Sequence, residues 1–308
     1  MILICGEALI DFTPVKLGKE NGYVPHPGGS PYNVAITLGR LKAYVSFLGK
    51  ISEDVFGEIL VSFLKENNVD LRYLLRGKEP TTLAFVIIGP DNEPHFVFYG
   101  DNSADSSLKV EELPSSFPSD VTLIHFGSIS LVREPTASTL EKLMEREKGR
   151  VLISLDPNVR PILISDKERY IKKLEKWISW TNLVKVSKVD LGWLYPGKSL
   201  KEIAENWLSL GPELVVITMG AQGSKAFSKE GFVEVPALKV NVVDTVGAGD
   251  SFMGGLLYWF WRSGKLNIRD FKKLSLKDIE DGLKFASKVA GLTCTRAGAN
   301  PPYLEELD

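Results

Sequence analysis

Residues 244–252 read Asp-Thr-Val-Gly-Ala-Gly-Asp-Ser-Phe, and an apolar run continues from there to Trp261. The run is too short to span a membrane and predicts a buried core helix. Gly247 and Gly249 would stand at the start of that helix. There, unpaired backbone N–H groups and the helix dipole favour an anion, and missing side chains allow it to come close. The spacing therefore predicts an anion-binding turn with Asp250 beside it.

Asp250 has two interpretations. A carboxylate beside an anion site weakens simple phosphate binding, but it could take a proton from a hydroxyl that attacks a phosphoryl group. An aspartate after a glycine turn is also a common cap at the start of a helix, and spacing alone favours that interpretation. A Walker A motif is excluded, because no lysine follows the glycines.

Outward from this turn, short apolar runs predict buried strands at 1–5, 44–48, 121–125, 151–155, 183–186 and 214–218. Segments with helical periodicity separate most of them, at 31–41, 55–67, 135–148, 166–180 and 199–210. This alternation predicts an α/β fold with a mostly parallel sheet covered by helices on both faces. Ligands of such sheets usually bind at the carboxyl ends of the strands.

Two stretches interrupt the alternation. Residues 82–88 and 95–99 are rich in β-branched and aromatic side chains and flank a Gly-Pro-Asp-Asn-Glu-Pro turn, which predicts a hairpin. Residues 12–27 also look extended. We expect a small β-sheet, formed by about 12–30 and 80–102, inserted in a single domain of residues 1–308. Periodicity leaves open whether this sheet covers a binding site or only decorates the domain.

The composition argues against several classes of partner. The 308 residues carry 37 Lys and Arg against 39 Asp and Glu, a net charge of -2, so we expect no nucleic-acid or membrane partner. The N-terminus lacks the basic start and long apolar stretch of a signal peptide, which favours a cytoplasmic protein. The two cysteines and three histidines show no zinc-ligand spacing.

A second polar segment precedes the first predicted helix. Residues 27–35 read Pro-Gly-Gly-Ser-Pro-Tyr-Asn-Val-Ala. Gly28 and Gly29 would allow close backbone approach, and the amide of Asn33 offers both a donor and an acceptor, which suits a neutral polyol. A turn that leads into a helix explains the same residues equally well.

Taken together, the two segments resemble the paired signatures of the ribokinase-like carbohydrate kinases, the phosphofructokinase B family. These are Gly-Gly-x-x-x-Asn near the N-terminus and Asp-Thr-x-Gly-Ala-Gly-Asp near the C-terminus, in the same order as here. The resemblance extends over essentially the whole chain. It implies a three-layer α/β/α fold with a mostly parallel central sheet and a small β-sheet lid, and an ATP-dependent sugar kinase.

The resemblance also implies roles for individual residues. Asp250 would be the catalytic base, and the amides of Gly247, Ala248 and Gly249 would stabilise the transferred phosphoryl group. The positions implied to bind the sugar are Asp11, Gly28, Gly29, Asn33, Phe98, Asn102 and Arg160. The positions implied to bind ATP, besides the glycine turn, are Lys185, Ser187, Thr218, Gly220, Gly223 and Ser287.

Metal sites follow from the same resemblance, with one departure. Where the family often has Asn-x-x-Glu, this chain has Ser187 and Asp190, so Asp190 would act on Mg²⁺ indirectly and with a shorter reach. A monovalent cation, K⁺ in particular, would be bound near Asp244, Val246 and Gly298. Exposed lids of this family often pair, which implies a homodimer through the lid.

Several segments of the chain resemble fructokinases and 2-keto-3-deoxygluconate kinases, and this resemblance ranks the candidate sugars. Fructose or another neutral ketose comes first. A keto-deoxy sugar acid is second, because the Arg160 guanidinium suits a carboxylate, although Asp156 could simply pair with it. A nucleoside is third, since the bulky Tyr32 disfavours it. A non-catalytic sugar or nucleotide sensor is the remaining alternative, which the retention of Asp250 with both flanking glycines argues against.

Overall fold

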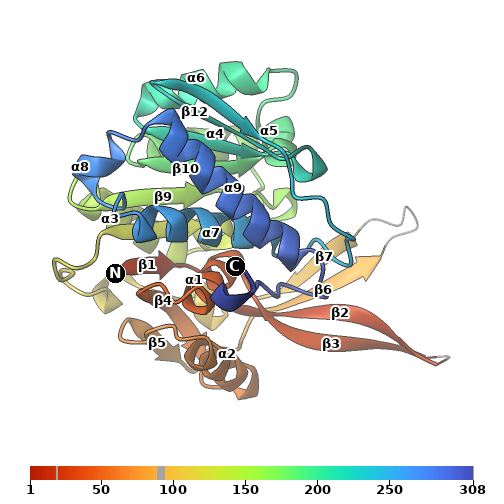
Figure 1. The fold of residues 1–308 in the computed structure, drawn as a ribbon. Helices are drawn as coiled ribbons and strands as arrows, with labels where there is room; N and C mark the ends of the chain where they lie inside the picture. The colour runs from red at the N-terminus through yellow and green to blue at the C-terminus, as the bar shows by residue number, and fades with distance from the viewer. Residues whose placement is uncertain (19, 89–93, 308) are drawn as a thin grey trace.

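A nine-stranded sheet forms the centre of the computed structural model, which describes residues 1–18, 20–88 and 94–307 (Figure 1). The strand order is β13-β12-β11-β10-β9-β8-β1-β4-β5. The pairs β11–β12 and β12–β13 are antiparallel and the others are parallel. The strands are β1 Ile2–Cys5, β4 Val45–Ser52, β5 Leu74–Gly77, β8 Leu123–Gly127, β9 Leu152–Asp156, β10 Leu183–Ser187, β11 Leu214–Thr218, β12 Ser224–Ser228 and β13 Gly231–Val235.

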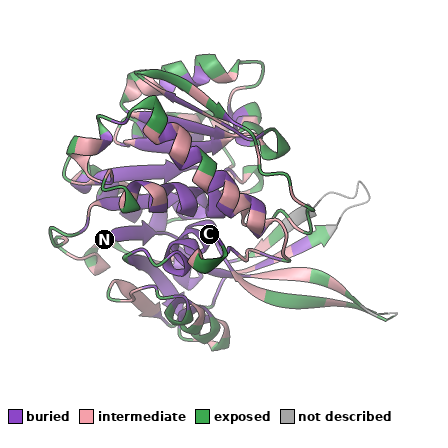
Figure 2. Ribbon diagram, viewed as in Figure 1, coloured by how far each residue is buried: buried purple, intermediate pink, exposed green. Residues whose placement is uncertain are grey.

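Helices cover both faces of this sheet and bury its strands (Figure 2). Alternate side chains of β1 point to opposite faces. Ile2 packs in a core with α1, α2, α7, α8 and α9, whereas Leu3 packs in a second core with α3, α4, α5 and α6. The helices are α1 Ser30–Arg40, α2 Val55–Glu66, α3 Thr136–Glu147, α4 Lys167–Ile178, α5 Lys188–Leu194, α6 Leu200–Leu210, α7 Ala248–Arg262, α8 Ile268–Phe271 and α9 Leu276–Thr293.

The predicted three-layer α/β/α arrangement is confirmed. Each of the six predicted strands and five predicted helices is present within a few residues of its expected bounds. Three strands of the large sheet were not predicted. One is β5, a short edge strand, and the others are β12 and β13, whose polar and apolar residues alternate without a long apolar run. No helix in the described part of the chain is long and apolar enough to cross a membrane.

The small sheet is present and has the order β3-β2-β6-β7. Its strands are β2 Leu9–Leu17, β3 Glu20–Gly28, β6 Leu83–Ile88 and β7 Pro94–Tyr99, with β2 parallel to β6 and the other pairs antiparallel. The sheet begins at Leu9, earlier than the expected residue 12, so Asp11 belongs to it. The expected hairpin turn falls mostly on residues 89–93, outside the described residues.

Candidate active site

Two neighbouring cavities meet at the start of α7. The first, of about 580 Å³, lies between the small sheet, the start of α1 and the start of α7. The second, of about 490 Å³, lies between the end of β11, residues 237–242 and helices α7 and α9. Thr245 and Gly249 line both cavities. The glycine turn is therefore the wall that the two cavities share.

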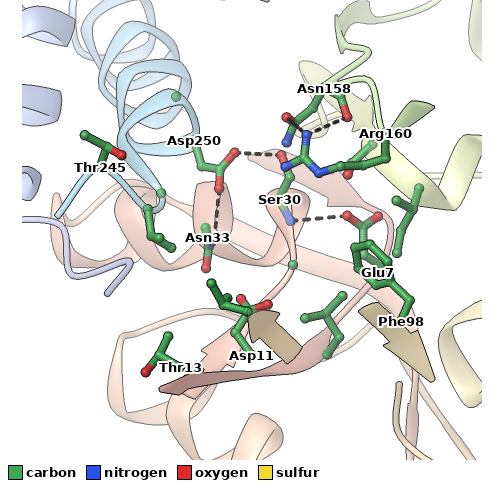
Figure 3. A pocket seen from close by; sticks show the side chains of 18 of the residues that line it. Glu7, Asp11, Thr13, Ser30, Asn33, Phe98, Asn158, Arg160, Thr245 and Asp250 are labelled. Atoms are coloured by element: carbon green, nitrogen blue, oxygen red, sulfur yellow. Dashed lines mark hydrogen bonds between the residues drawn. The ribbon is translucent and has the colours of Figure 1, made fainter. Parts of the chain in front are cut away.

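Asp250 lies in the first cavity and is directed at α1 (Figure 3). Its Oδ1 accepts a hydrogen bond of 2.7 Å from the hydroxyl of Ser30, and its Oδ2 accepts one of 2.8 Å from the side-chain amide of Asn33. Gly247, in the left-handed region with φ 73°, is the N-cap of α7. The capping interpretation of Asp250 is therefore wrong. The residue lies inside the first turn of α7, and its carboxylate accepts hydrogen bonds from side chains of α1.

The groups around Asp250 have opposite effects on its pKa. Burial, with a smaller contribution from the charge of Asp156, raises the pKa of Asp250 above its usual value, although the hydrogen bonds from Asn33 and Ser30 and the charge of Lys185 act to lower it. Donors on both carboxylate oxygens favour the ionised form. The carboxylate is thus a desolvated base held in a fixed orientation, the arrangement that proton abstraction from a hydroxyl requires.

Most positions predicted to bind the sugar meet in the first cavity. These are Asp11, Gly29, Asn33, Phe98 and Arg160. Gly28 lies behind Asp11, where a Cβ atom would come within 2.0 Å of the Asp11 Oδ2, so the bare glycine leaves room for that carboxylate. Asn102 is exposed in the turn after β7 and lines neither cavity.

A carboxyl group of the first cavity has a strongly raised pKa. Burial, together with the charge of Asp250, raises the pKa of Asp11 to about 7, against the opposing charge of Arg160. Arg160 donates a hydrogen bond of 2.7 Å to the side-chain oxygen of Asn158. The alternative in which Asp156 simply pairs with Arg160 is not what the structure shows, because Asp156 accepts a hydrogen bond of 2.7 Å from Lys185.

The predicted nucleotide residues divide between the two cavities. Thr218, Gly220, Gly223, Ala248 and Ser287 line the second cavity, and Lys185 lines the first.

Ser187 lines neither cavity. Its hydroxyl caps the start of α5 by accepting a hydrogen bond of 3.0 Å from the backbone N–H of Asp190.

The predicted cation residues lie close together. Asp244 accepts hydrogen bonds from the backbone N–H groups of Val246, at 3.0 Å, and Gly298, at 2.8 Å, which ties two loops together at the edge of the first cavity. Asp190 is buried in the first turn of α5. Among the described residues, no group of three or more His, Cys, Asp and Glu side chains could hold a metal ion by itself.

Several polar residues of the first cavity were not predicted as site residues, among them Ser30 and Glu7. Ser30 lay inside the quoted Gly-Gly segment, but nothing in its position indicated a bond to Asp250. Glu7 follows β1 and accepts hydrogen bonds of 3.2 Å from the backbone N–H groups of Ser30 and Ser130. Tyr32 does not disfavour a nucleoside, contrary to the expectation from its size, since it is fully buried and its hydroxyl donates a hydrogen bond to the carbonyl of Leu60.

The proteins similar to this chain include fructokinases. A fructokinase of Rhizobium leguminosarum bv. trifolii is 39% identical over 284 residues, which is 92% of this chain and 86% of the relative. The structure of a Xylella fastidiosa fructokinase with bound ATP is 30% identical, with a TM-score of 0.89 over 99% of this chain and 96% of that one.

A third relative was solved with its ligands. The fructokinase of Vibrio cholerae O395, with bound fructose, ADP and calcium ion, is 28% identical, with a TM-score of 0.84 over 97% of this chain and 94% of that one. A double mutant of the same protein was solved with fructose, ADP and potassium ion. The sequence profile of the pfkB family of carbohydrate kinases matches residues 1–306. Since the match covers nearly its whole length, this chain belongs to the pfkB family of carbohydrate kinases.

Proposed function

We propose that this chain transfers the γ-phosphate of ATP to a hydroxyl of fructose, with Asp250 as the general base. One observation carries the proposal: Asp250 lies in the first cavity, next to Gly249, which lines both cavities. A sugar in the first cavity and a nucleotide in the second would therefore meet at Asp250. The similarity to fructokinases supports fructose as the sugar.

In the proposed reaction, the sugar hydroxyl gives its proton to Asp250 while its oxygen forms a bond to the γ-phosphorus. The bond from that phosphorus to the β,γ-bridging oxygen breaks, and ADP leaves with the electron pair. The N–H groups of the glycine turn, from Gly247 to Gly249, would stabilise the charge on the transferred group. A primary hydroxyl, the least hindered nucleophile, is the proposed acceptor.

The small sheet would serve as the lid of a single kinase domain. Asp11 and Phe98 on its inner face line the first cavity, across from Asp250. Asp11, Asn33 and Arg160 would bind the sugar hydroxyls, and Phe98 would pack over the sugar. Such a lid excludes water, which would otherwise accept the phosphoryl group from ATP.

A keto-deoxy sugar acid is the second candidate substrate, on the strength of Arg160. A guanidinium in the cavity can bind a carboxylate through two hydrogen bonds. The first cavity also contains Glu7, Asp11 and Asp250, however, and these carboxylates would repel the acid. A neutral ketose avoids that repulsion, and for this reason we rank fructose as the first candidate substrate.

The nucleotide would occupy the second cavity. Its adenine would lie near Ser287 and its phosphates would extend past Gly220 and Gly223 toward Lys185. Residues 218–223 would supply backbone contacts, and Ser187 a hydroxyl on the phosphate side. Because ATP is the proposed donor, we place the protein in the cytoplasm.

The cations would be held largely by the phosphates and by loop oxygens. Mg²⁺ usually keeps several waters and binds through phosphates and one or two carboxylates, which Asp190 could reach through water. A monovalent cation such as K⁺ would bind at Asp244, where the loops of Val246 and Gly298 meet and the carboxylate keeps further lone pairs.

The outer face of the lid supports a homodimer. The Phe85 ring contacts those of Tyr23 and Tyr99, with centroids 5.3 and 5.7 Å apart. Tyr23, Ile87, Val97 and Tyr99 are exposed on this face. Exposed apolar patches of this kind mark interaction surfaces. Light scattering should give twice the chain mass, and a Tyr99→Asp variant should give the monomer mass.

The proposed activity is tested by ADP release with ATP, Mg²⁺ and a panel of ketoses, sugar acids and nucleosides. Fructose should give the highest kcat/KM, and mass spectrometry should detect the sugar phosphate. If a sugar acid is the preferred substrate, it replaces fructose as the proposed acceptor. If sugar and ATP bind but no acceptor stimulates ADP release, the protein is a sensor and the proposed function is wrong.

A further inference from the structure

A buried ion pair connects two neighbouring strands behind the glycine turn. Lys185, in β10, donates a hydrogen bond of 2.7 Å from its Nζ to Oδ2 of Asp156, the last residue of β9. The side chains are 5% and 1% exposed. Desolvation of two charges cancels much of their attraction, so a buried pair is a weak source of stability. Another role for this pair is therefore worth testing.

The lysine reaches the site and the aspartate does not. Lys185 lines the first cavity, and a Cβ atom on Gly249 would lie 3.0 Å from its Nζ. The ammonium thus lies against the glycine turn, in space that a side chain at position 249 would crowd. Asp156 lines neither cavity. It can reach the reaction through its hydrogen bond to Lys185 and, to a smaller extent, through its charge, which raises the pKa of Asp250.

The groups around Lys185 keep it charged. Burial by itself would lower the pKa of Lys185, but the charge and hydrogen bond of Asp156, with added charge from Asp250 and Asp190, raise it above its usual value. From β8, His125 faces the same region, and burial lowers its pKa to about 3, so it is neutral at physiological pH.

Among the described residues, Lys185 is the one hydrogen-bond partner of the Asp156 carboxylate. Its Oδ1 is buried and has no hydrogen-bond partner within the part of the chain that the structure describes. The carboxylate is therefore not held by a wider network, and the position of each partner depends on the other.

We infer that Asp156 is a positioning residue, which holds the Lys185 ammonium against the glycine turn, where the transferred phosphoryl group would lie. This inference rests on the proposed function. A fixed cation at that point needs no reorganisation as negative charge moves from the attacking oxygen toward ADP, which is how preorganised groups lower a barrier.

A double-mutant cycle tests the inference, with kcat measured under saturating MgATP and sugar. Loss of one preorganised charge costs about 10²-fold in kcat, which we expect for Lys185→Met. Asp156→Asn should lower kcat at least tenfold. In the Lys185→Met background, the same Asp156→Asn change should alter kcat less than about threefold, because the group through which it acts is absent.

The pH profile gives a readout that a purely structural role would not change. Without Asp156, burial should lower the pKa of Lys185. The kcat of Asp156→Asn should therefore fall as the pH rises from 7 to 9.5, while the wild type and the double variant stay level. Additive effects in the cycle, or no alkaline fall, would overturn the inference.

Glu147→Gln is the matched control. Glu147 is also a buried carboxylate, paired with Arg146 at 2.7 Å, but it lies at the end of α3 and lines neither cavity. It should lower stability and leave kcat and its pH profile unchanged. If Asp156→Asn does not fold, Asp156→Glu replaces it, since it keeps the charge but displaces the ammonium. Its kcat should fall at least tenfold, and a kcat within twofold of the wild type contradicts the inference.

The role of the Asp156–Lys185 pair can also be tested if the proposed function is wrong. If no acceptor supports turnover, equilibrium binding of a non-hydrolysable ATP analogue with Mg²⁺ still tests the pair. Asp156→Asn should then weaken binding more at pH 9 than at pH 7, and this difference should vanish in the Lys185→Met background. Its persistence there would overturn the inference whatever the acceptor.

Discussion

The hydroxyl of Ser30 donates a hydrogen bond of 2.7 Å to Oδ1 of Asp250, although the two residues are 220 positions apart in the chain. Ser30 is the first residue of α1, and Asp250 lies in the first turn of α7. Asn33, one turn further along α1, holds the other carboxylate oxygen at 2.8 Å. The start of α1 is thus a support for the proposed base as well as a wall of the sugar cavity.

Ser30→Ala should shift the acid limb of the kcat/KM profile to higher pH. The hydroxyl stabilises the ionised carboxylate, so its loss raises the pKa of Asp250. A hydrogen bond to a charged group contributes about 1.5–3 kcal/mol, and one pKa unit is about 1.4 kcal/mol, so the limb should move by about one unit or more. The profile of kcat/KM reports the free enzyme.

Ser46→Ala is the control for this change. Ser46 is as deeply buried in β4, and its hydroxyl bonds to the carbonyl of Asp70, away from both cavities. Its acid limb should coincide with that of the wild type. An unshifted limb in Ser30→Ala would mean that the hydrogen bond does not tune the base.

Glu7 should make the protein less stable as the pH rises. Burial, against opposing hydrogen bonds, raises the pKa of Glu7 from 4.5 to about 7. Because the folded state holds the proton more tightly, this contribution to stability is complete below about pH 4.5 and is lost as the pH rises to about 7.

Urea unfolding of the wild type and Glu7→Gln across this range measures the effect. The wild type should lose stability relative to the variant by up to about 3 kcal/mol between the two limits, since each pKa unit is about 1.4 kcal/mol. A difference in unfolding free energy that does not change with pH would show that the carboxyl titrates normally.

Gly247→Ala should destabilise the fold more than Gly264→Ala. Both glycines have nearly the same left-handed backbone, with φ of 73° and 72°. An alanine at that φ costs roughly 1–2 kcal/mol at either site. At Gly247 the new Cβ would also lie 2.5 Å from the Cβ of Ala299, whereas nothing lies within 4 Å at Gly264.

The extra clash should add about 1–3 kcal/mol, the usual cost of overpacking. Urea unfolding of the two variants isolates this contribution, because the backbone term is common to both. Equal unfolding free energies would contradict the close contact between the glycine turn and Ala299.

The layered fold could be predicted from the sequence, because buried parallel strands are continuous apolar runs and their helices carry a clear period. The site was harder. The local pattern of glycines indicated the anion turn, yet by itself it favoured a capping role for Asp250. The paired signatures implied a base instead, and the hydrogen bonds from Ser30 and Asn33 on another helix exclude the cap.

Contacts between distant side chains could not be predicted at all. The sequence offers Arg160 as a partner for Asp156, four residues away, but the structure gives it Lys185 on the next strand. Tyr32 lies beside the Gly-Gly segment and still points into the core, because its position on α1 faces the sheet. Such choices depend on how the elements pack, which no local pattern records.

The most direct test compares ADP release by the wild type and Asp250→Asn with fructose, ATP and Mg²⁺. We predict fructose-dependent ADP release by the wild type and a loss of about 10²-fold or more in kcat for the variant, which should still bind both substrates. Unchanged turnover in Asp250→Asn would contradict the role of Asp250 as the base.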